Sequence, residues 1–168
     1  MARYARCMVD LHIRRARLSD ALGIATVHVQ AWRESYAHLA APAALKALDV
    51  EQRALRWLAI LEDGVTDVWV AEHQNAVIGW ATASRGAGVD APRPLELEGL
   101  YVLAEFYGSG VGQQLLDRAV DSLPAYLWMA ADNPRAAAFY RRNGFTPDGT
   151  AGTHDLVGTS VSIIRLIR

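Results

Sequence analysis

Residues 100–116 read LYVLAEFYGSGVGQQLL, an apolar strand that runs into a glycine-rich turn and then into an amphipathic helix. The turn, Tyr107-Gly108-Ser109-Gly110-Val111-Gly112, places its glycines at every second residue. Backbone N–H groups at the start of such a helix point outward, and the helix dipole adds positive potential there. This stretch therefore predicts a binding site for a phosphate-bearing ligand.

Two familiar phosphate-binding turns fit this stretch poorly. A P-loop needs a lysine directly after its last glycine, and no lysine lies near this turn. A dinucleotide-binding turn needs a glycine at the position of Gln113 and follows the first strand of a βαβ unit. Here the preceding strands, 67–72 and 76–84, are separated by a tight turn and predict a hairpin. A glycine-rich helix start without any ligand is the third alternative.

A second pattern lies at residues 133–145, NPRAAAFYRRNGF. It matches NxxAxxxYxxxGF, and Gly110 and Gly112 occupy the glycine positions of [QR]xxGx[GA]. With both motifs in this order, the chain resembles the GNAT superfamily of N-acetyltransferases over about residues 11–168. One position departs from the pattern, because Tyr107 stands where the family has Gln or Arg. This departure puts the affinity for the coenzyme in question.

We expect one α/β (α+β) domain over residues 11–168, after an N-terminal tail of residues 1–10. The resemblance implies a mixed central sheet of about seven strands, with helices on both faces and a splay between the fourth and fifth strands. Periodicity predicts strands at 11–15, 67–72, 76–84, 95–103 and 125–131, and from 145 onward with the last at 159–167. It predicts helices after an N-cap at Ser19, at 34–48 with a break near Pro42, at 51–62, after the glycine turn, and from Asn133 to Gly144.

The resemblance implies acetyl-CoA as co-substrate, with its diphosphate on the glycine turn. The pantetheine arm would pair with the backbone of Leu100–Val102. A bulge is expected beside these residues at Gly99, because glycine in a strand often marks one. Asn133 and Tyr140 are seven residues apart, so both lie along one face of their helix. The residues expected to bind the cofactor are Leu100, Tyr101, Val102, Tyr107, Gly108, Ser109, Gly110, Val111, Gly112, Asn133, Ala136 and Tyr140.

The expected reaction moves an acetyl group from the thioester to a primary amine by direct attack in a ternary complex. An alkyl ammonium group, with a pKa near ~10.4, must lose its proton first, and a carboxylate can accept it. In the family the base is commonly a Glu four residues before the first cofactor-pairing residue, so counting back from Leu100 the resemblance implies Glu96. Glu98 is its rival, and the two share one side of an ideal strand. Tyr140 would protonate the leaving thiolate. The alternative is that Glu96 and Glu98 are both solvated or structural carboxylates with no part in catalysis.

The acceptor side is less informative. Trp32 and Tyr36 lie near the join of the first two helices, and His154 lies near the last hairpin, so these three are candidates for substrate contacts. Core packing also explains Trp32 and Tyr36, and a surface position explains His154. We expect a small-molecule or peptide amine as acceptor. A non-catalytic acyl-CoA-binding sensor module of the same fold is the alternative function, and Tyr107 favours it.

Composition and charge narrow the other function classes. The formal net charge is −1 and the chain has one cysteine. These features suggest neither a nucleic-acid partner nor an internal disulfide, and no His/Cys cluster has metal-ligand spacing. No apolar run approaches the ~20 residues that span a bilayer. We therefore expect a cytoplasmic protein without metal, nucleic acid or membrane contacts. Because small acetyltransferases of this family often form dimers, the resemblance also implies a homodimer.

Overall fold

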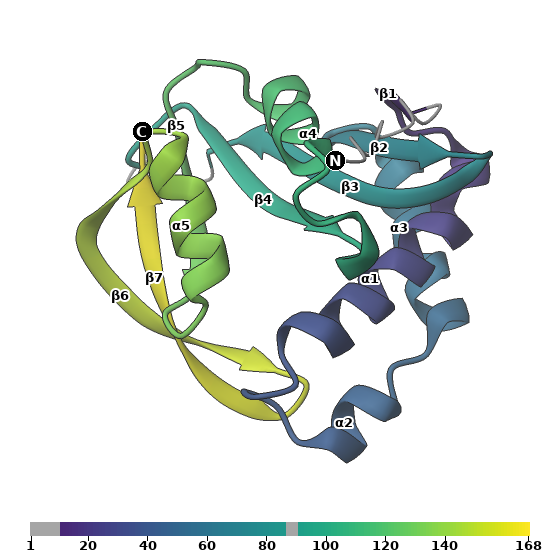
Figure 1. The fold of residues 1–168 in the computed structure, drawn as a ribbon, viewed down its shortest axis with the longest axis horizontal. Coiled ribbons are helices and arrows are strands. Elements are labelled where there is room, and N and C mark those ends of the chain that lie inside the picture. Colours follow the sequence, from purple (N-terminus) through teal and green to yellow (C-terminus); the bar gives the residue numbers. More distant parts are fainter. Residues whose placement is uncertain (1–10, 87–90) are drawn as a thin grey trace, which may run out of the picture.

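The computed structural model describes residues 11–86 and 91–168, so the expected tail lies outside the described residues. Seven strands form one sheet in the order β1-β2-β3-β4-β5-β7-β6. All neighbouring strands are antiparallel except β4 and β5, which are parallel. The mixed sheet and fold class predicted from the sequence are therefore confirmed (Figure 1). Among the described residues, no helix is long and apolar enough to cross a membrane.

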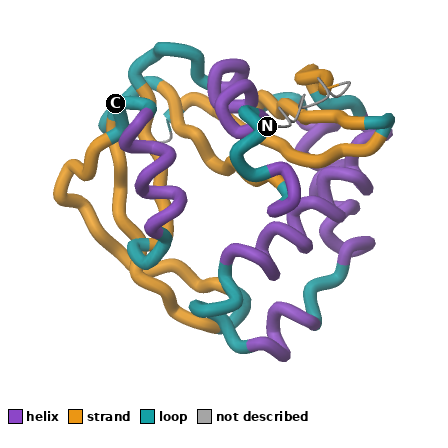
Figure 2. Tube along the Cα trace, viewed as in Figure 1, coloured by secondary structure: helices purple, strands orange, loops and turns teal. Residues whose placement is uncertain are grey.

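The element bounds are close to the predicted ones. The strands are β1 (Leu11–Arg15), β2 (Asp67–His73), β3 (Ala76–Arg85), β4 (Leu95–Val102), β5 (Ala125–Ala130), β6 (Thr146–Leu156) and β7 (Thr159–Ile167). The helices are η1 (Leu18–Asp20), α1 (Ala21–Ser35), α2 (Pro42–Lys46), α3 (Val50–Asp63), η2 (Ala104–Phe106), α4 (Val111–Ala119) and α5 (Pro134–Arg142). Figure 2 shows how the helices are distributed around the strands.

Helices cover both faces of the sheet, as predicted. Along β3, Trp80 packs in a cluster with Ile24 of α1 and Trp57 of α3. The next residue, Ala81, points to the opposite face and packs with Leu115 of α4. α5 joins α4 on that second face, where Tyr140 shares a cluster with residues of β5 and β7. At the tip of the β6–β7 hairpin, Leu156 and Val161 pack with residues of α2 and of the end of α1.

The predicted splay between the fourth and fifth strands is confirmed. β4 and β5 pair only at Leu95↔Ala125 and Glu96↔Tyr126. Beyond these two pairs β4 continues to Val102 along β3, while β5 pairs with β7. The edge of β4 that faces β5 therefore has no strand partner after Glu96, and its backbone groups face a gap in the sheet (Figure 1).

A β-bulge lies at the start of this gap. Ala83 pairs with Leu97 and Thr82 pairs with Gly99, so Glu98 is the extra residue in β4. A Cβ atom at Gly99 would lie 2.7 Å from Cζ3 of Trp80, which explains why glycine stands there. The expectation of a bulge beside Gly99 is therefore confirmed.

Two helix predictions were wrong. Ser19 does not cap α1, because it lies within η1 and the helix begins at Ala21 after Asp20. The Asp20 carboxylate instead accepts hydrogen bonds from the Arg17 N–H and from Arg14, and this pairing ties η1 to β1. The helix predicted over 34–48 is also absent as such. α1 extends to Ser35, the chain then turns, and only the short helix α2 follows, with Pro42 in its first turn.

Candidate functional site

A cavity of about 480 Å³ opens where β4 and β5 diverge. Residues of α1, β4, the glycine turn, β5 and α5 line it. The predicted site residues that line it are Tyr36, Glu98, Leu100, Tyr101, Val102, Tyr107, Gly108, Gly110, Gly112, Asn133, Ala136 and Tyr140. Those that do not line it are Trp32, Glu96, Ser109, Val111 and His154.

The glycine turn presents backbone N–H groups to this cavity. Gly110 has a φ of +91° and precedes the first residue of α4, a conformation that favours glycine. The first intrahelical bond runs from the Gln114 N–H to the Gly110 carbonyl. The N–H groups of the three residues between them have no acceptor within the helix, and Gly110 has no side chain to cap them. This arrangement suits an anionic ligand.

The other residues of the turn support it from behind. Val111 is buried in the cluster under α4, and the Ser109 hydroxyl donates to the Phe106 carbonyl over 2.5 Å. Their side chains are therefore used in holding the turn. At Gly112 a Cβ atom would lie 3.7 Å from the Phe139 ring of α5, an ordinary van der Waals contact, so space alone does not require glycine at that position.

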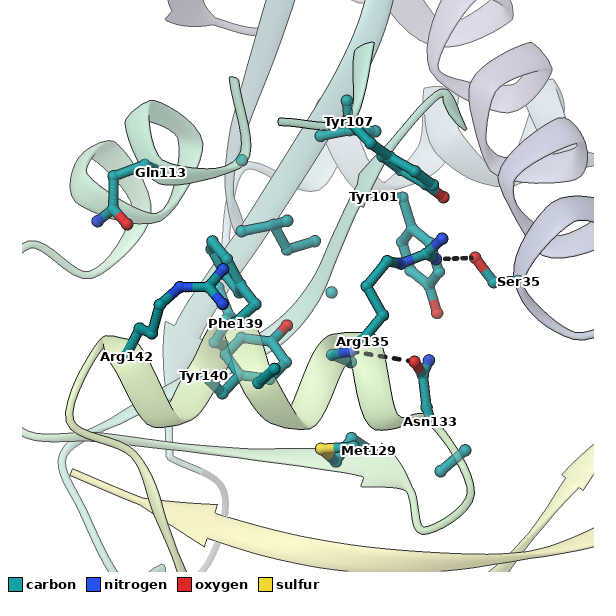
Figure 3. A pocket seen from close by; sticks show the side chains of 18 of the residues that line it. Ser35, Tyr101, Tyr107, Gln113, Met129, Asn133, Arg135, Phe139, Tyr140 and Arg142 are labelled. Carbon is teal, nitrogen blue, oxygen red and sulfur yellow. Dashed lines mark hydrogen bonds between the residues drawn. The ribbon is translucent and has the colours of Figure 1, made fainter. Parts of the chain in front are cut away.

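Arg135 is a cavity residue that sequence reasoning missed. Its guanidinium lies 3.9 Å from the centroid of the Tyr107 ring and donates to the Ser35 hydroxyl over 3.1 Å. Figure 3 shows the side chain reaching from the start of α5 toward Tyr107 and α1. A cation therefore lies beside residue 107 although that residue is not basic. The only sequence signal was the place of Arg135 in the first turn of a helix already assigned to the site.

α5 contributes a capped N-terminus and a buried hydroxyl. The Asn133 side-chain oxygen accepts the Ala136 N–H over 3.1 Å, so the predicted helix cap is confirmed. The cap uses only that oxygen, which leaves the amide nitrogen able to donate to a ligand. Tyr140 is 8% exposed, and in Figure 3 its hydroxyl points into the cavity. Burial, and to a lesser degree the nearby Tyr36, raise the pKa of Tyr140, so this hydroxyl stays protonated.

The two candidate carboxylates occupy different places. Ser84 donates its hydroxyl to Glu98 over 2.7 Å, and Tyr126 donates its hydroxyl to Glu96 over 2.6 Å. Ser84 is the strand partner of Glu96, so its bond to Glu98 places both carboxylates on one face of the sheet. Only Glu98 lines the cavity. Position alone therefore separates two residues that the sequence left as rivals.

Aromatic side chains form the wall of the cavity next to α1. The hydroxyls of Tyr36 and Tyr101 lie 2.8 Å apart, and burial raises the pKa of both. Behind Tyr101, the Trp57 indole N–H donates to Nδ1 of His28 over 3.2 Å. Burial, and then the charge of Arg53, lower the pKa of His28 to about 3, so this imidazole is neutral near pH 7.

The remaining predicted acceptor residues lie away from the cavity. The centroid of the Trp32 ring lies 4.9 Å from that of His28, so Trp32 belongs to the aromatic group behind Tyr101. His154 is exposed on β6 opposite Val161. Among the residues in 11–86 and 91–168, no group of three His, Cys, Asp or Glu side chains could hold a metal ion.

Known proteins resemble this chain in sequence and in fold. The family model for the acetyltransferase (GNAT) domain matches residues 64–147. A probable N-acetyltransferase of Mycobacterium tuberculosis is 29% identical over 152 residues, which cover 86% of this chain and 84% of that protein. Another relative, an uncharacterized N-acetyltransferase of Bacillus subtilis, is 28% identical over 150 residues, covering 83% and 81% of the two chains.

The solved structures agree on the fold. The PaiA N-acetyltransferase of Thermoplasma acidophilum, solved in complex with coenzyme A, superposes with a TM-score of 0.70 at 20% identity, covering 93% of this chain and 98% of that one. A ribosomal-protein-alanine N-acetyltransferase of Brucella melitensis gives 0.70 at 21% identity, covering 94% and 98%. The family match, the relatives and the splayed sheet agree with the two sequence motifs, and the chain belongs to the GNAT acetyltransferase family.

Proposed function

We propose that this protein transfers an acetyl group from acetyl-CoA to a primary amine by direct attack in a ternary complex. The observation that carries the proposal is the single cavity at the splay. It joins the N-terminus of α4 and the Tyr140 hydroxyl on one side of the sheet to the Glu98 carboxylate on the other. This arrangement supports a site in which anion binding, an acid and a base act together.

The cofactor side of the cavity fits coenzyme A. The N–H groups at the start of α4 and the Arg135 guanidinium offer donors to a diphosphate. The unpaired edge of β4 from Leu100 to Val102 offers backbone groups to the amides of a pantetheine arm. Asn133 also lines the cavity, and the helix cap uses only its side-chain oxygen. Acetyl-CoA would supply the activated acyl group, and the related structure solved with coenzyme A supports this assignment.

Glu98 is the group we propose as the general base. An amine with a pKa near ~10.4 costs about 4–5 kcal/mol to deprotonate at pH 7, and a positioned carboxylate accepts that proton directly or through water. Glu98 lines the cavity, and the bond from Ser84 orients its carboxylate. Glu96 is the alternative base, and it would have to act from its place beside Tyr126.

Tyr140 is the group we propose as the acid. The leaving thiol has a pKa near ~8.5, so a protonated hydroxyl within reach can donate to it as the carbon–sulfur bond breaks. Burial keeps the Tyr140 hydroxyl protonated, and this hydroxyl points into the cavity (Figure 3). The proton lost from the amine and the proton gained by the thiolate therefore pass through groups on opposite sides of the gap.

Thiol release tests the proposal against the sensor alternative. The full-length protein with acetyl-CoA is assayed across a panel of primary amines, and coenzyme A binding is measured in parallel by calorimetry. We expect binding together with amine-dependent thiol release that Tyr140→Phe reduces. Binding with no amine-dependent release, identical in the Tyr140→Phe variant, would favour the sensor. Failure to bind coenzyme A at all would reject both functions.

A further inference from the structure

Trp128 is a large apolar side chain left open to the cavity. It is 36% exposed, whereas the strand residues on either side of it, Leu127 and Met129, are buried. It lines the cavity, and no part of the proposed chemistry uses it. A partly exposed indole in a ligand cavity presents a rigid apolar face at low cost in side-chain entropy, so such a residue often contacts a ligand.

The indole is held in place from the neighbouring strand. Arg165 pairs with Trp128 across β5 and β7, and its guanidinium lies over the indole ring at 5.7 Å from the centroid. Arg165 is in turn fixed by Asp148 over 2.7 Å and by the Thr150 hydroxyl over 2.9 Å. The charge of Arg165 is thus compensated within the hairpin, and the ring is supported from the strand beside it.

Glu98 and Trp128 lie at the start of the same gap. β4 and β5 are parallel and last pair at Glu96↔Tyr126, and each of the two residues comes two positions beyond that pair and lines the cavity. Tyr126 binds Glu96 and Ser84 binds Glu98, which places all of these side chains on one face of the sheet. α5 packs against the other face, so this one is where an acceptor can approach the thioester.

We propose that Trp128 is the acceptor platform, and that the acceptor is a primary amine joined through a short linker to a flat apolar group. This inference rests on the proposed function. The flat group stacks on the indole while the amino group extends across the gap to the Glu98 carboxylate. Aromatic pairs contribute beyond their buried area, so the ring should improve binding over an amine without one.

Calorimetry with 2-phenylethylamine and ethylamine tests this proposal on the full chain, with and without saturating coenzyme A. We expect 2-phenylethylamine to bind at least about tenfold more tightly than ethylamine in the wild type. Trp128→Leu should remove that advantage and Trp128→Phe should keep most of it. With a turned-over amine, Trp128→Leu should raise its KM and leave the KM for acetyl-CoA unchanged.

A matched control and the coenzyme titration make the outcomes decisive. Leu55→Ala changes an exposed apolar residue on α3, outside the cavity, and should leave amine binding as in the wild type. Equal binding of the two amines by the wild type, or a ring advantage that survives Trp128→Leu, would overturn the proposal. Absence of coenzyme A binding would instead reject the proposed function, while the amine titration without coenzyme still decides the role of Trp128.

Discussion

The cavity has two walls that are built in different ways. The cofactor wall, formed by the start of α4 and by α5, relies on backbone N–H groups, on glycines without side chains and on the Asn133 cap. The acceptor wall, formed by Glu98, Tyr36 and Trp128, relies on side chains from three separated elements. Backbone geometry needs particular residues at fixed spacing, whereas a side-chain wall can be built from many residue types.

Under the proposed function, this difference predicts where specificity resides. A diphosphate and a pantetheine arm are the same in every acyl-CoA, so the cofactor wall can be made of backbone groups that every chain possesses. In the proposed function the acceptor wall recognises the amine, and its side chains can vary without disturbing α4. Changes on the cofactor wall should therefore affect every substrate alike, and changes on the acceptor wall should affect amines selectively.

The largest effect is expected at Glu98. Glu98→Gln should lower turnover at pH 7 by about 10²–10⁴-fold, the usual contribution of a positioned acid–base group. The loss should shrink as the pH rises toward the pKa of the amine, because the amine then needs no base. Rate profiles between pH 6 and 10 with a fixed amine measure this, with Glu96→Gln as the matched control. A larger loss in Glu96→Gln would move the base to that residue.

Tyr140→Phe should lower turnover at least about tenfold, because it removes the proton donor and keeps the buried ring. The KM for acetyl-CoA and the unfolding midpoint should change little. Steady-state kinetics with a thiol reagent, together with a urea melt, measure both effects. Wild-type turnover in a variant that folds normally would remove Tyr140 from the acid role.

The buried His28, which packs behind the acceptor wall, should make the folded protein less stable at low pH. His28 has a pKa of about 3 in the folded protein and about 6.5 when unfolded, so between these values only the unfolded chain binds the proton. The free energy of unfolding should therefore decrease as the pH is lowered, by about 1.2 kcal/mol from pH 7 to pH 5.5 on account of this residue alone. Urea melts at both pH values measure the fall. His28→Gln should remove this part of it, and His154→Gln, at an exposed position, should not.

The smallest effect is expected at the turn. Gly110→Ala puts a side chain at a φ of +91°, a strain of about 1–2 kcal/mol that tilts the N–H groups away from the ligand. The dissociation constant of coenzyme A should rise about fivefold or more. Gly149→Ala in β6 carries similar strain at a φ of +88° outside the cavity, so it should destabilise the fold without lowering the affinity for coenzyme A. Calorimetry that finds equal affinity in both variants would contradict the assignment.

The cofactor wall was the part that the sequence could predict. Gly110 and Asn133 leave clear local signals, because a left-handed turn and a helix cap each restrict the residue type strongly. The splay could be expected only through the family resemblance, since the end of strand pairing after Glu96 depends on long-range packing. Local patterns were also weak at the start of α1, where Asp20 binds Arg14 of β1 instead of leaving Ser19 to cap.

The acceptor wall could not be predicted in the same way. Trp128 lies in the apolar strand 125–131, and an apolar run does not distinguish a buried side chain from one that is 36% exposed. The positions of Glu96 and Glu98 depend on where the bulge falls and on Tyr126 and Ser84, which are distant in sequence. Arg135 carried no signal of its reach across the cavity.

The most direct test is an amide chemical-shift titration of the full-length protein with coenzyme A. If the start of α4 holds the diphosphate, the N–H signals of Val111, Gly112 and Gln113 should show the largest shifts and should saturate with added coenzyme. Pantetheine, which lacks the diphosphate, should leave those three signals nearly unmoved. Unchanged signals from these residues at millimolar coenzyme A would contradict the account.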